Sequence, residues 1–361
     1  MFYVNLLLKR ITPIFLLFLV TFSLSAQVGG TKSYRFLDIP MTARAAALGG
    51  SNMSVWGDDI NLVYSNPALL NPSMSKQVAF NYSNYVSDLK FGYLGYGHDL
   101  KKYGTVGGGI QFFNYGKMQG YDEFGDKTGT FKANDYNIAL NYAKSLEDSS
   151  FNVGISLKTI ISQYDVYQSY GNAIDFGITY HNKNSLTISL LAKNIGWIYK
   201  SYSNTLEKNE PLPQNVQLGL SYKVQKAPFR FILIYDQLNK WNQRYISPVD
   251  TAGKTSPFTS ETEEPKDSTK FQKFGKRFSA TSDNFIRHII IGTEIVLTKN
   301  FNLRIAYNHR RQREMILPER RGVNGLSLGF GFKIKKMGFA YSFTKMAFPG
   351  NSSIFSFSYC F

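Results

Sequence analysis

From Val78 to the end of this chain, apolar residues recur at every second position, with Gly, Ser, Asn, Thr, Lys and Ala between them. One clear example is the series Phe151, Val153, Ile155 and Leu157. A period of two places neighbouring side chains on opposite faces of a β-strand, so each such segment is predicted to have one apolar face. A soluble sandwich and a membrane barrel both fit this alternation.

The lengths of the connections separate these two folds. Short connections such as HDLKKYG, AKSLEDSS and VQKAP alternate with the long ones 116–130, 196–215, 237–285 and 310–324, and only the first hairpin, near 87–90, is an exception. Outer-membrane barrels produce this alternation because their strands cross one layer up and down, with short periplasmic turns and long outer loops. The sequence therefore predicts an all-β fold, a transmembrane antiparallel β-barrel of about 14 strands over residues 78–361. We place the strands at 78–86, 91–100, 105–116, 130–143, 151–164, 171–181, 185–195, 216–225, 229–236, 286–298, 301–309, 325–335, 337–345 and 353–361.

Residues 1–26 have the pattern of a secretory signal peptide. A basic pair precedes an apolar run at 11–24, and small residues follow. This run is too short to span a bilayer comfortably and contains Pro13, which disfavours the alternative of a membrane anchor. We therefore expect cleavage after Ser25 or Ala26 and export to the outer membrane of a Gram-negative bacterium.

The composition limits the classes of partner. The chain carries 41 Lys and Arg against 25 Asp and Glu, a formal net charge of +16, together with 16% aromatic residues and 30 glycines. A basic balance favours anionic partners, and for an exported chain we expect lipopolysaccharide phosphates and carboxylates and not nucleic acid. The single cysteine, Cys360, excludes an internal disulfide framework.

Residues 27–77 do not alternate like the rest of the chain. An alanine-rich patch at 42–48 is predicted to be helical and to end at the Gly-Gly pair that follows it. In the element Asn66, Pro67 and Ala68, the Asn is suited to cap a turn and the Pro to fix its first position. The segment is too short for an independent domain and too apolar for a disordered tail. We therefore expect it to pack as a hatch or plug inside or beneath the barrel.

The runs YRFLDIPMTARAAALGG and DDINLVYSNPALLNP resemble the N-terminal signature of the PorQ family of the type IX secretion system. They resemble, more loosely, PorV barrels and FadL-type transporters of hydrophobic compounds, which share the Asn-Pro-Ala element. NYGKMQGYDEFGDKTGTF and AKNIG are also similar to the PorQ family. The resemblance covers most of the mature chain and is weakest over 237–285. It implies an outer-membrane barrel of the same strand number with an N-terminal hatch.

The resemblance also implies a partner. PorQ-like proteins belong to a surface attachment complex with PorU, PorV and PorZ, which removes the C-terminal sorting domain of secreted proteins and joins these proteins to anionic lipopolysaccharide. The implied role is an anchor for a PorZ-like protein and not the sortase. The alternative is a FadL-like channel for hydrophobic small molecules, which needs an apolar pocket and a lateral opening, often at a kinked strand. Predicted lumen positions carry Ser, Asn, Lys and Gly more than apolar residues, which favours the anchor.

No pattern of catalytic or metal-binding residues emerges from the sequence. The four histidines lie outside any HExxH motif, and one cysteine cannot form a cysteine-rich zinc site. Asp58 with Asp59, and Asp122 with Glu123 and Asp126, suggest calcium, but turn formation explains them better because the spacing is not that of an EF-hand. A run of three glycines lacks the Lys-Ser/Thr pair of a phosphate loop. We therefore predict a protein that is not an enzyme, with no cofactor and no metal ion.

Two candidate interaction sites remain. The polar insertion at 237–285 is either a solvated linker or a docking loop. The outer loop HRRQREMILPERR holds five arginines whose guanidinium groups suit phosphate or carboxylate, although ordinary solvated charge is the simpler interpretation. These candidate contacts with a partner or lipopolysaccharide are Arg310, Arg311, Arg313, Arg320 and Arg321.

The chain closes with SSIFSFSYCF, in which Phe355, Phe357, Tyr359 and Phe361 are predicted to face lipid. Closure of the barrel requires this strand to pair with the first one near Val78, because a free edge is not tolerated in lipid. A terminal aromatic strand also resembles the signal by which outer-membrane barrels are recognised for assembly. Deletion of Phe361 is therefore expected to lower the amount of folded, heat-modifiable barrel in the outer membrane.

Overall fold

The computed structural model describes residues 32–84, 89–146, 150–182, 185–202, 210–243, 281–315, 323–345 and 351–361. All of them belong to the second of two compact units, Met1–Thr31 and Lys32–Phe361. The predicted signal peptide lies outside the described residues, as do residues 244–280 of the predicted insertion.

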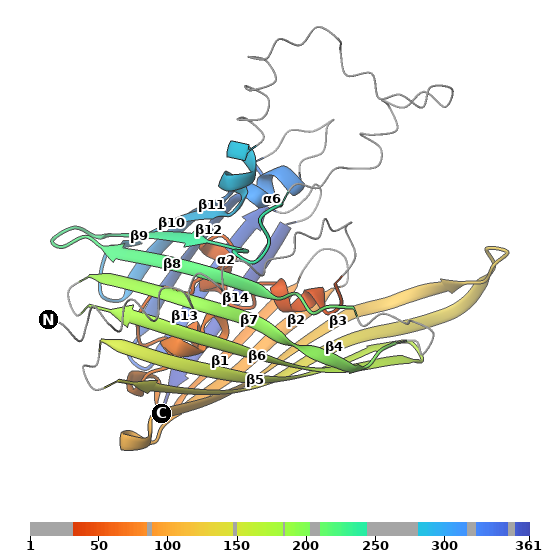
Figure 1. The fold of residues 1–361 in the computed structure, drawn as a ribbon, viewed down its shortest axis with the longest axis horizontal. Helices are drawn as coiled ribbons and strands as arrows, with labels where there is room; N and C mark the ends of the chain where they lie inside the picture. Colours follow the sequence, from red (N-terminus) through yellow and green to blue (C-terminus); the bar gives the residue numbers. More distant parts are fainter. Residues whose placement is uncertain are drawn as a thin grey trace, which may run out of the picture. The chain divides into compact units, whose positions relative to one another are not determined.

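Within the described residues, fourteen antiparallel strands close into a barrel, as the alternation predicts (Figure 1). Each strand pairs with its neighbours in sequence, and β14 pairs with β1 so that Val78 lies opposite Tyr359. The strands are β1 (Gln77–Asn84), β2 (Lys90–Asp99), β3 (Thr105–Tyr121), β4 (Lys127–Ser145), β5 (Phe151–Tyr164), β6 (Tyr167–His181), β7 (Leu186–Lys200), β8 (Asn215–Lys223), β9 (Phe229–Tyr235), β10 (Ile289–Val296), β11 (Phe301–Asn308), β12 (Leu326–Ile334), β13 (Met337–Lys345) and β14 (Asn351–Cys360).

The outer face of the barrel is apolar. Large side chains such as Leu140, Phe231 and Ile291 are about half exposed or more, and Tyr82 and Tyr142 lie near opposite strand ends. A water-soluble protein would not expose so continuous an apolar surface, whereas a bilayer matches the apolar band and its aromatic borders. The barrel is therefore one that spans a membrane.

The connections after β7, β9 and β11 are long, as predicted, but the fourth predicted long loop is mostly strand. Residues 116–130 continue β3 and β4 as a hairpin, which closes at the turn 122–126 (Figure 1). The pairing persists past a register shift between Asn114 and Lys117, because every further cross-strand pair satisfies backbone hydrogen-bonding groups. β6 likewise begins at Tyr167, before the predicted residue 171.

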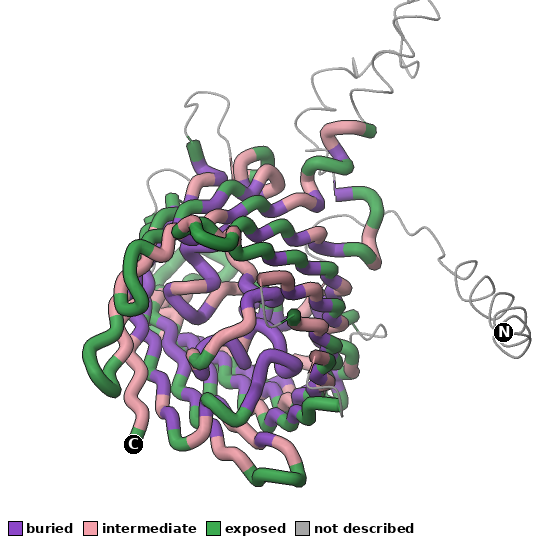
Figure 2. The backbone as a smooth tube through the Cα atoms, turned by 90° about the vertical axis from the view of Figure 1, so that its left-hand side faces the viewer, coloured by how far each residue is buried: buried purple, intermediate pink, exposed green. Residues whose placement is uncertain are grey.

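Residues 32–76 fold inside the barrel, and we call them the plug. Figure 2, which faces the end with the short turns, shows this mostly buried segment within the ring of strands. Thr42 caps the alanine-rich helix by accepting the Ala45 amide proton at 3.3 Å, and Gly49 and Gly50 end it with φ of +85° and +109°. The plug comprises η1 (Arg35–Asp38), α2 (Ala43–Ala47), α3 (Leu62–Ser65), η2 (Pro67–Leu69) and η3 (Pro72–Met74).

Among the described residues, helices outside the plug lie in three connections between strands, the first being η4 (Lys101–Tyr103) between β2 and β3. Residues 281–287 are helical before β10, and α6 (His309–Glu314) follows β11. Across the part of the chain that the structure describes, no helix has the length and apolar character needed to cross a bilayer.

Candidate functional site

The Asn66-Pro67-Ala68 element fastens the plug to the barrel wall. The Oδ1 atom of Asn66 accepts the Ala68 amide proton at 2.9 Å and so caps η2. Its Nδ2 atom donates to the carbonyl oxygen of Met53 at 2.9 Å and to Oγ1 of Thr179, on β6, at 3.2 Å. One side-chain amide therefore both shapes the turn and binds the wall.

Two wall glycines permit this contact. A Cβ atom at Gly154, on β5, would clash with the backbone of Pro67 and Ala68, and one at Gly177, on β6, would clash with the side chain of Asn66. Neither glycine has a left-handed backbone. Close approach of the plug, and not backbone conformation, is therefore the reason for glycine at both positions.

Further round the barrel wall, past β7 and β8, a buried carboxylate joins the plug to three strands. Glu294, on β10, accepts hydrogen bonds from Nε and Nη2 of Arg44 in α2, both at 2.9 Å. It also accepts from Nη1 of Arg230, on β9, at 2.6 Å and from Nε of Arg304, on β11, at 2.9 Å. A buried carboxylate is tolerated only with such partners, so these four side chains act as one unit, which we call the Glu294 cluster.

Between these two attachments the lumen is closely packed. The plug side chains Met41, Leu48 and Met53 are fully buried. A cavity beside Lys158 and Asp175, whose side chains form an ion pair at 2.6 Å, has a volume of about 20 Å³. Such a cavity holds about one water molecule and is far too small for a hydrocarbon.

Aromatic side chains lead from the outer end of the long strands into the core. Tyr202 contacts Tyr164 at a ring-centroid distance of 5.3 Å, and Tyr164 contacts Tyr115 at 5.8 Å. Tyr115 in turn contacts Phe113 at 6.3 Å, and Phe113 meets Phe36 of the plug at 5.3 Å. These five side chains form a continuous aromatic file.

The hydroxyl groups at the outer end of the file surround a buried carboxylate. Tyr115 and Tyr164 donate to Oδ2 of Asp135, on β4, at 2.6 and 3.0 Å, and Ser162 donates to its Oδ1 atom. Asp135 is fully buried, and its partners in the described residues are hydroxyl donors. The aromatic file therefore has apolar rings along its length and the Asp135 carboxylate with its hydroxyl donors near its outer end.

In the predicted arginine cluster, Arg310 pairs with Asp236, and its Nη2 atom lies 2.9 Å from the Oδ2 atom of that carboxylate. Burial alone would raise the pKa of Asp236, but the Arg310 guanidinium and the side-chain amides of Gln217 and Asn215 hold that pKa below its usual range. The pair therefore fastens α6 to the end of β9.

Arg311 and Arg313 also make internal contacts. Arg311 is buried, and its Nη2 atom donates to the carbonyl oxygen of Gly49, at the end of α2, at 3.2 Å. Nε of Arg313 lies 3.1 Å from Oδ1 of Asp283, and its side chain is 52% exposed. Arg311 of helix α6 therefore contacts the plug, whereas Arg313 contacts the helical residues 281–287. The remaining two arginines of the cluster, Arg320 and Arg321, lie outside the described residues. A contact of this loop with lipopolysaccharide stays a prediction.

The acidic residues considered for calcium have other roles. The Oδ1 atom of Asp122 accepts the amide protons of Phe124 and Asp126 at 3.0 and 2.8 Å, in the turn that closes the β3–β4 hairpin. Asp58 pairs with Lys333 at 2.6 Å. Among the described residues, no group of three or more His, Cys, Asp or Glu side chains is placed to hold a metal ion.

The Glu294 cluster was not foreseen from the sequence, although a signal for it exists. Arg230 lies between Phe229 and Phe231, which face outward, so the period of two places Arg230 in the lumen. Glu294 and Arg304 occupy inward positions on β10 and β11 in the same way. A charged residue at an inward position requires a partner there, so such positions could have indicated the cluster.

Comparison with solved structures shows the same fold elsewhere. The toluene transporter TodX of P. putida is similar with a TM-score of 0.51 and 13% identity, over 90% of this chain and 99% of that chain. The barrel has the fold of FadL-type outer-membrane proteins. A deltaS2S3 mutant of TodX, a monoaromatic hydrocarbon channel, has a TM-score of 0.50 and 12% identity, over 89% of this chain and 99% of that chain. At such identities the likeness concerns the fold alone.

Sequence comparisons add no relative. No family model matches this sequence, and no curated protein matches it.

Proposed function

We propose that this protein is a non-enzymatic anchor in the outer membrane, which holds a PorZ-like surface protein in a type IX attachment complex with PorU and PorV. The observation that carries the proposal is the plug, which is bound to two separate parts of the barrel wall through Asn66 and Glu294. A barrel closed in this way suits a support better than a passage. The resemblance of the N-terminal runs to the PorQ family supports the same role.

The outer end offers a surface for such a partner. β3 pairs with β2 as far as Asn114, and β4 pairs with β5 from Ala133 onward. Beyond these points the described residues 115–121 and 127–131 form a ribbon of two strands with no further strand beside it (Figure 1). Free strand edges can accept a strand of a partner, and Phe124 at the tip is 84% exposed. We propose this ribbon as the docking element.

The test is a tagged full-length protein in which residues 117–131 are replaced by a two-residue turn. The matched control replaces the exposed β5–β6 turn, Asp165 and Val166, with Asn-Gly. We expect the shortened ribbon to lose most of the PorZ-like protein recovered from outer membranes, while both barrels stay heat-modifiable and the control keeps its partner. Normal removal of the cargo sorting domain in cells that lack this protein would contradict the anchor.

A second candidate function is a channel for hydrophobic molecules. The aromatic file from Tyr202 to Phe36 favours it, as does the fold shared with TodX, a toluene transporter. Passage would require the plug to leave the wall, because the cavity beside it holds only about one water molecule. Uptake of labelled toluene that depends on this protein, and persists without the PorZ-like protein, would favour the channel.

A further inference from the structure

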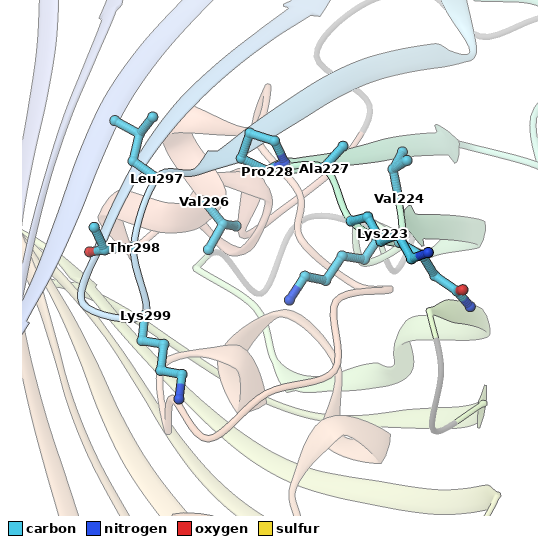
Figure 3. A pocket seen from close by; sticks show the side chains of 10 residues that line it. Lys223, Val224, Ala227, Pro228, Val296, Leu297, Thr298 and Lys299 are labelled. Atoms are coloured by element: carbon cyan, nitrogen blue, oxygen red, sulfur yellow. The ribbon is translucent and has the colours of Figure 1, made fainter.

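The short-turn end of β9 and β10 meets water. A pocket of about 750 Å³ opens there between the β8–β9 turn and the β10–β11 turn, and the exposed Lys223, Lys226 and Lys299 are among the residues that line it (Figure 3). Unpaired ammonium groups lie outside the hydrocarbon of a bilayer. The pocket therefore marks the periplasmic boundary of the membrane on this part of the wall.

From that boundary, the two strands are too short to cross the apolar band. β9 has 7 residues and β10 has 8. A strand of this length is about 25 Å long, and at the usual tilt it rises only about 19 Å. The apolar band of an outer-membrane barrel is about 25 Å tall. The residues that follow β9 and precede β10 therefore lie at the outer boundary of the band.

These residues carry large exposed apolar side chains. Leu238 and Trp241 follow β9, and Phe285 and Ile286 lie in the helical segment 281–287 before β10. Each is between 39% and 53% exposed, which is the range of the lipid-facing residues of β9. We call these four side chains the outer patch.

Ring contacts make the outer patch continuous with the lipid-facing side of the wall. Tyr235 ends the outward series of β9 and pairs with Ile289 of β10. The ring of Phe285 lies 5.6 Å from that of Tyr235. The ring of His288 stacks on Tyr235 at 5.2 Å and on Trp241 at 5.8 Å. The apolar surface of the barrel thus extends past the ends of the strands.

Buried side chains pair the irregular backbone that follows β9. The two ring nitrogens of His288 lie 2.7 and 2.9 Å from the carbonyl oxygens of Asp236 and Trp241. Asn284 accepts the amide proton of Gln243 at 2.8 Å and donates to the carbonyl oxygen of Trp241 at 2.7 Å. At membrane depth, irregular backbone is tolerated only where protein groups cover and pair it. The backbone here finds its partners within the protein, as contact with a bilayer requires.

The charged side chains beside the outer patch are compatible with the same position. Arg287 pairs with Asp283 at 2.8 Å, and Asp236 pairs with Arg310 at 2.9 Å. Charged groups near lipid are usually paired in this way. The flexible stem of Lys240 can bring its ammonium group to water.

We propose that residues 236–243 and 281–287 extend the short wall into the outer leaflet, where the outer patch contacts lipid acyl chains. Trp241 then belongs to the outer aromatic girdle of the barrel. The extension compensates for the shortness of β9 and β10, so the wall matches the bilayer without longer strands. This contact depends on the place of the barrel in a membrane and not on which surface protein the barrel holds.

The test measures the surroundings of Trp241 by fluorescence in the full chain, which has three tryptophans. W56F with W197F leaves Trp241 alone. Two matched controls add F231W or F124W to W56F, W197F and W241F, which places the single tryptophan on β9 or at the tip of the ribbon. Vesicles of phosphatidylcholine carry bromine near the ester end of the acyl chains, and a second set without bromine receives acrylamide in the water. Heat-modifiable mobility shows that each variant is folded.

We expect the brominated lipid to quench Trp241 about as strongly as the tryptophan at position 231 and several times more strongly than that at position 124, because girdle aromatics contact the upper acyl chains. Acrylamide should give the reverse order. Acrylamide quenching equal to that at position 124 would show that the patch faces water, and quenching by neither agent would show that protein covers it. Either result overturns the proposal. The difference between the unchanged protein and W241F gives the same measurement where a multiple variant does not fold.

Discussion

Two parts of the barrel wall hold the same plug by different physical means. On the β5 and β6 side, the plug backbone packs directly against Gly154 and Gly177, and Asn66 binds the wall with a neutral amide. On the β9 to β11 side, Arg44 reaches the wall through the buried Glu294. The first attachment requires wall residues without a Cβ atom, and the second requires the ion pairs of Glu294.

This difference follows the lengths of the strands. β5 and β6 have 14 and 15 residues, whereas β9, β10 and β11 have 7, 8 and 8. Shorter strands share fewer backbone hydrogen bonds with their neighbours, so side chains contribute more to holding that wall together. The Glu294 cluster joins all three short strands to each other as well as to the plug. The two attachments are therefore expected to fail in different ways.

Glu294→Gln should have the largest effect. It removes the carboxylate and leaves the buried Arg304 and the partly buried Arg44 and Arg230 without their shared counter-charge. Breaking a buried ion pair on one side costs about 3–5 kcal/mol of unfolding free energy. Urea unfolding of the barrel in lipid vesicles measures this loss. Glu123→Gln, at an exposed turn position, is the control and should be neutral; a loss below about 1 kcal/mol for Glu294→Gln would mean that the cluster is not coupled to stability.

Gly154→Ala tests the other side. The added Cβ atom meets the backbone of Pro67 and Ala68, which cannot rotate away as a side chain would. Overpacking of this kind costs about 1–3 kcal/mol and should expose the plug to protease. Gly108→Ala is the matched control, because its Cβ atom would lie at least 3.7 Å from its nearest neighbours. If both variants unfold alike, close packing of the plug is not what requires Gly154.

The wall of the barrel was predictable because its signal is local. Along a strand such as β5, the period of two indicates on which face of the sheet each side chain lies. The long connections on one side then favour a barrel over a sandwich. The predicted pairing of the last strand with Val78 follows from the need to close the sheet. Residues 116–130 were predicted to be a loop because they are mostly glycine and polar residues. The strands continue there without the apolar face on which the prediction depends.

The contacts inside the lumen were less predictable because they join residues far apart in the chain. Asn66 was predicted to cap a turn, and it does, but its bond to Thr179 depends on where the plug lies in the barrel. The partnership of Arg44 and Glu294 spans 250 residues and follows from no spacing rule. Arg311 belongs to a predicted solvated cluster, yet α6 directs it to the carbonyl of Gly49.

Acid should destabilise the β9 to β11 wall at a higher pH than the wall at Gly154 and Gly177, because Asp236 loses its charge. The pKa of Asp236 is lowered in the folded protein, so its contribution is present above its ordinary pKa of 3.8 and is lost as pH falls through the folded value. Asp236→Asn should cost roughly 1.5 kcal/mol at pH 7 and make the unfolding free energy depend less steeply on pH as pH falls below about 5. Asp165→Asn, in an exposed turn, serves as the control. An unchanged pH dependence in Asp236→Asn would show that other groups govern this range.

The smallest effect is expected away from both attachments, at the β3–β4 turn. Asp122→Ala removes the acceptor of two amide protons, from Phe124 and Asp126, at a cost of about 0.5–1 kcal/mol because water can partly replace an exposed acceptor. The loss should stay within the ribbon, since the described residues 115–121 and 127–131 have no further strand beside them. Hydrogen exchange should therefore rise over 116–131 in Asp122→Ala and not in Glu123→Ala, with urea unfolding of the barrel unchanged in both. A matching shift in barrel unfolding would mean that the ribbon and the wall unfold as one unit, and that the ribbon cannot move independently when it receives a partner.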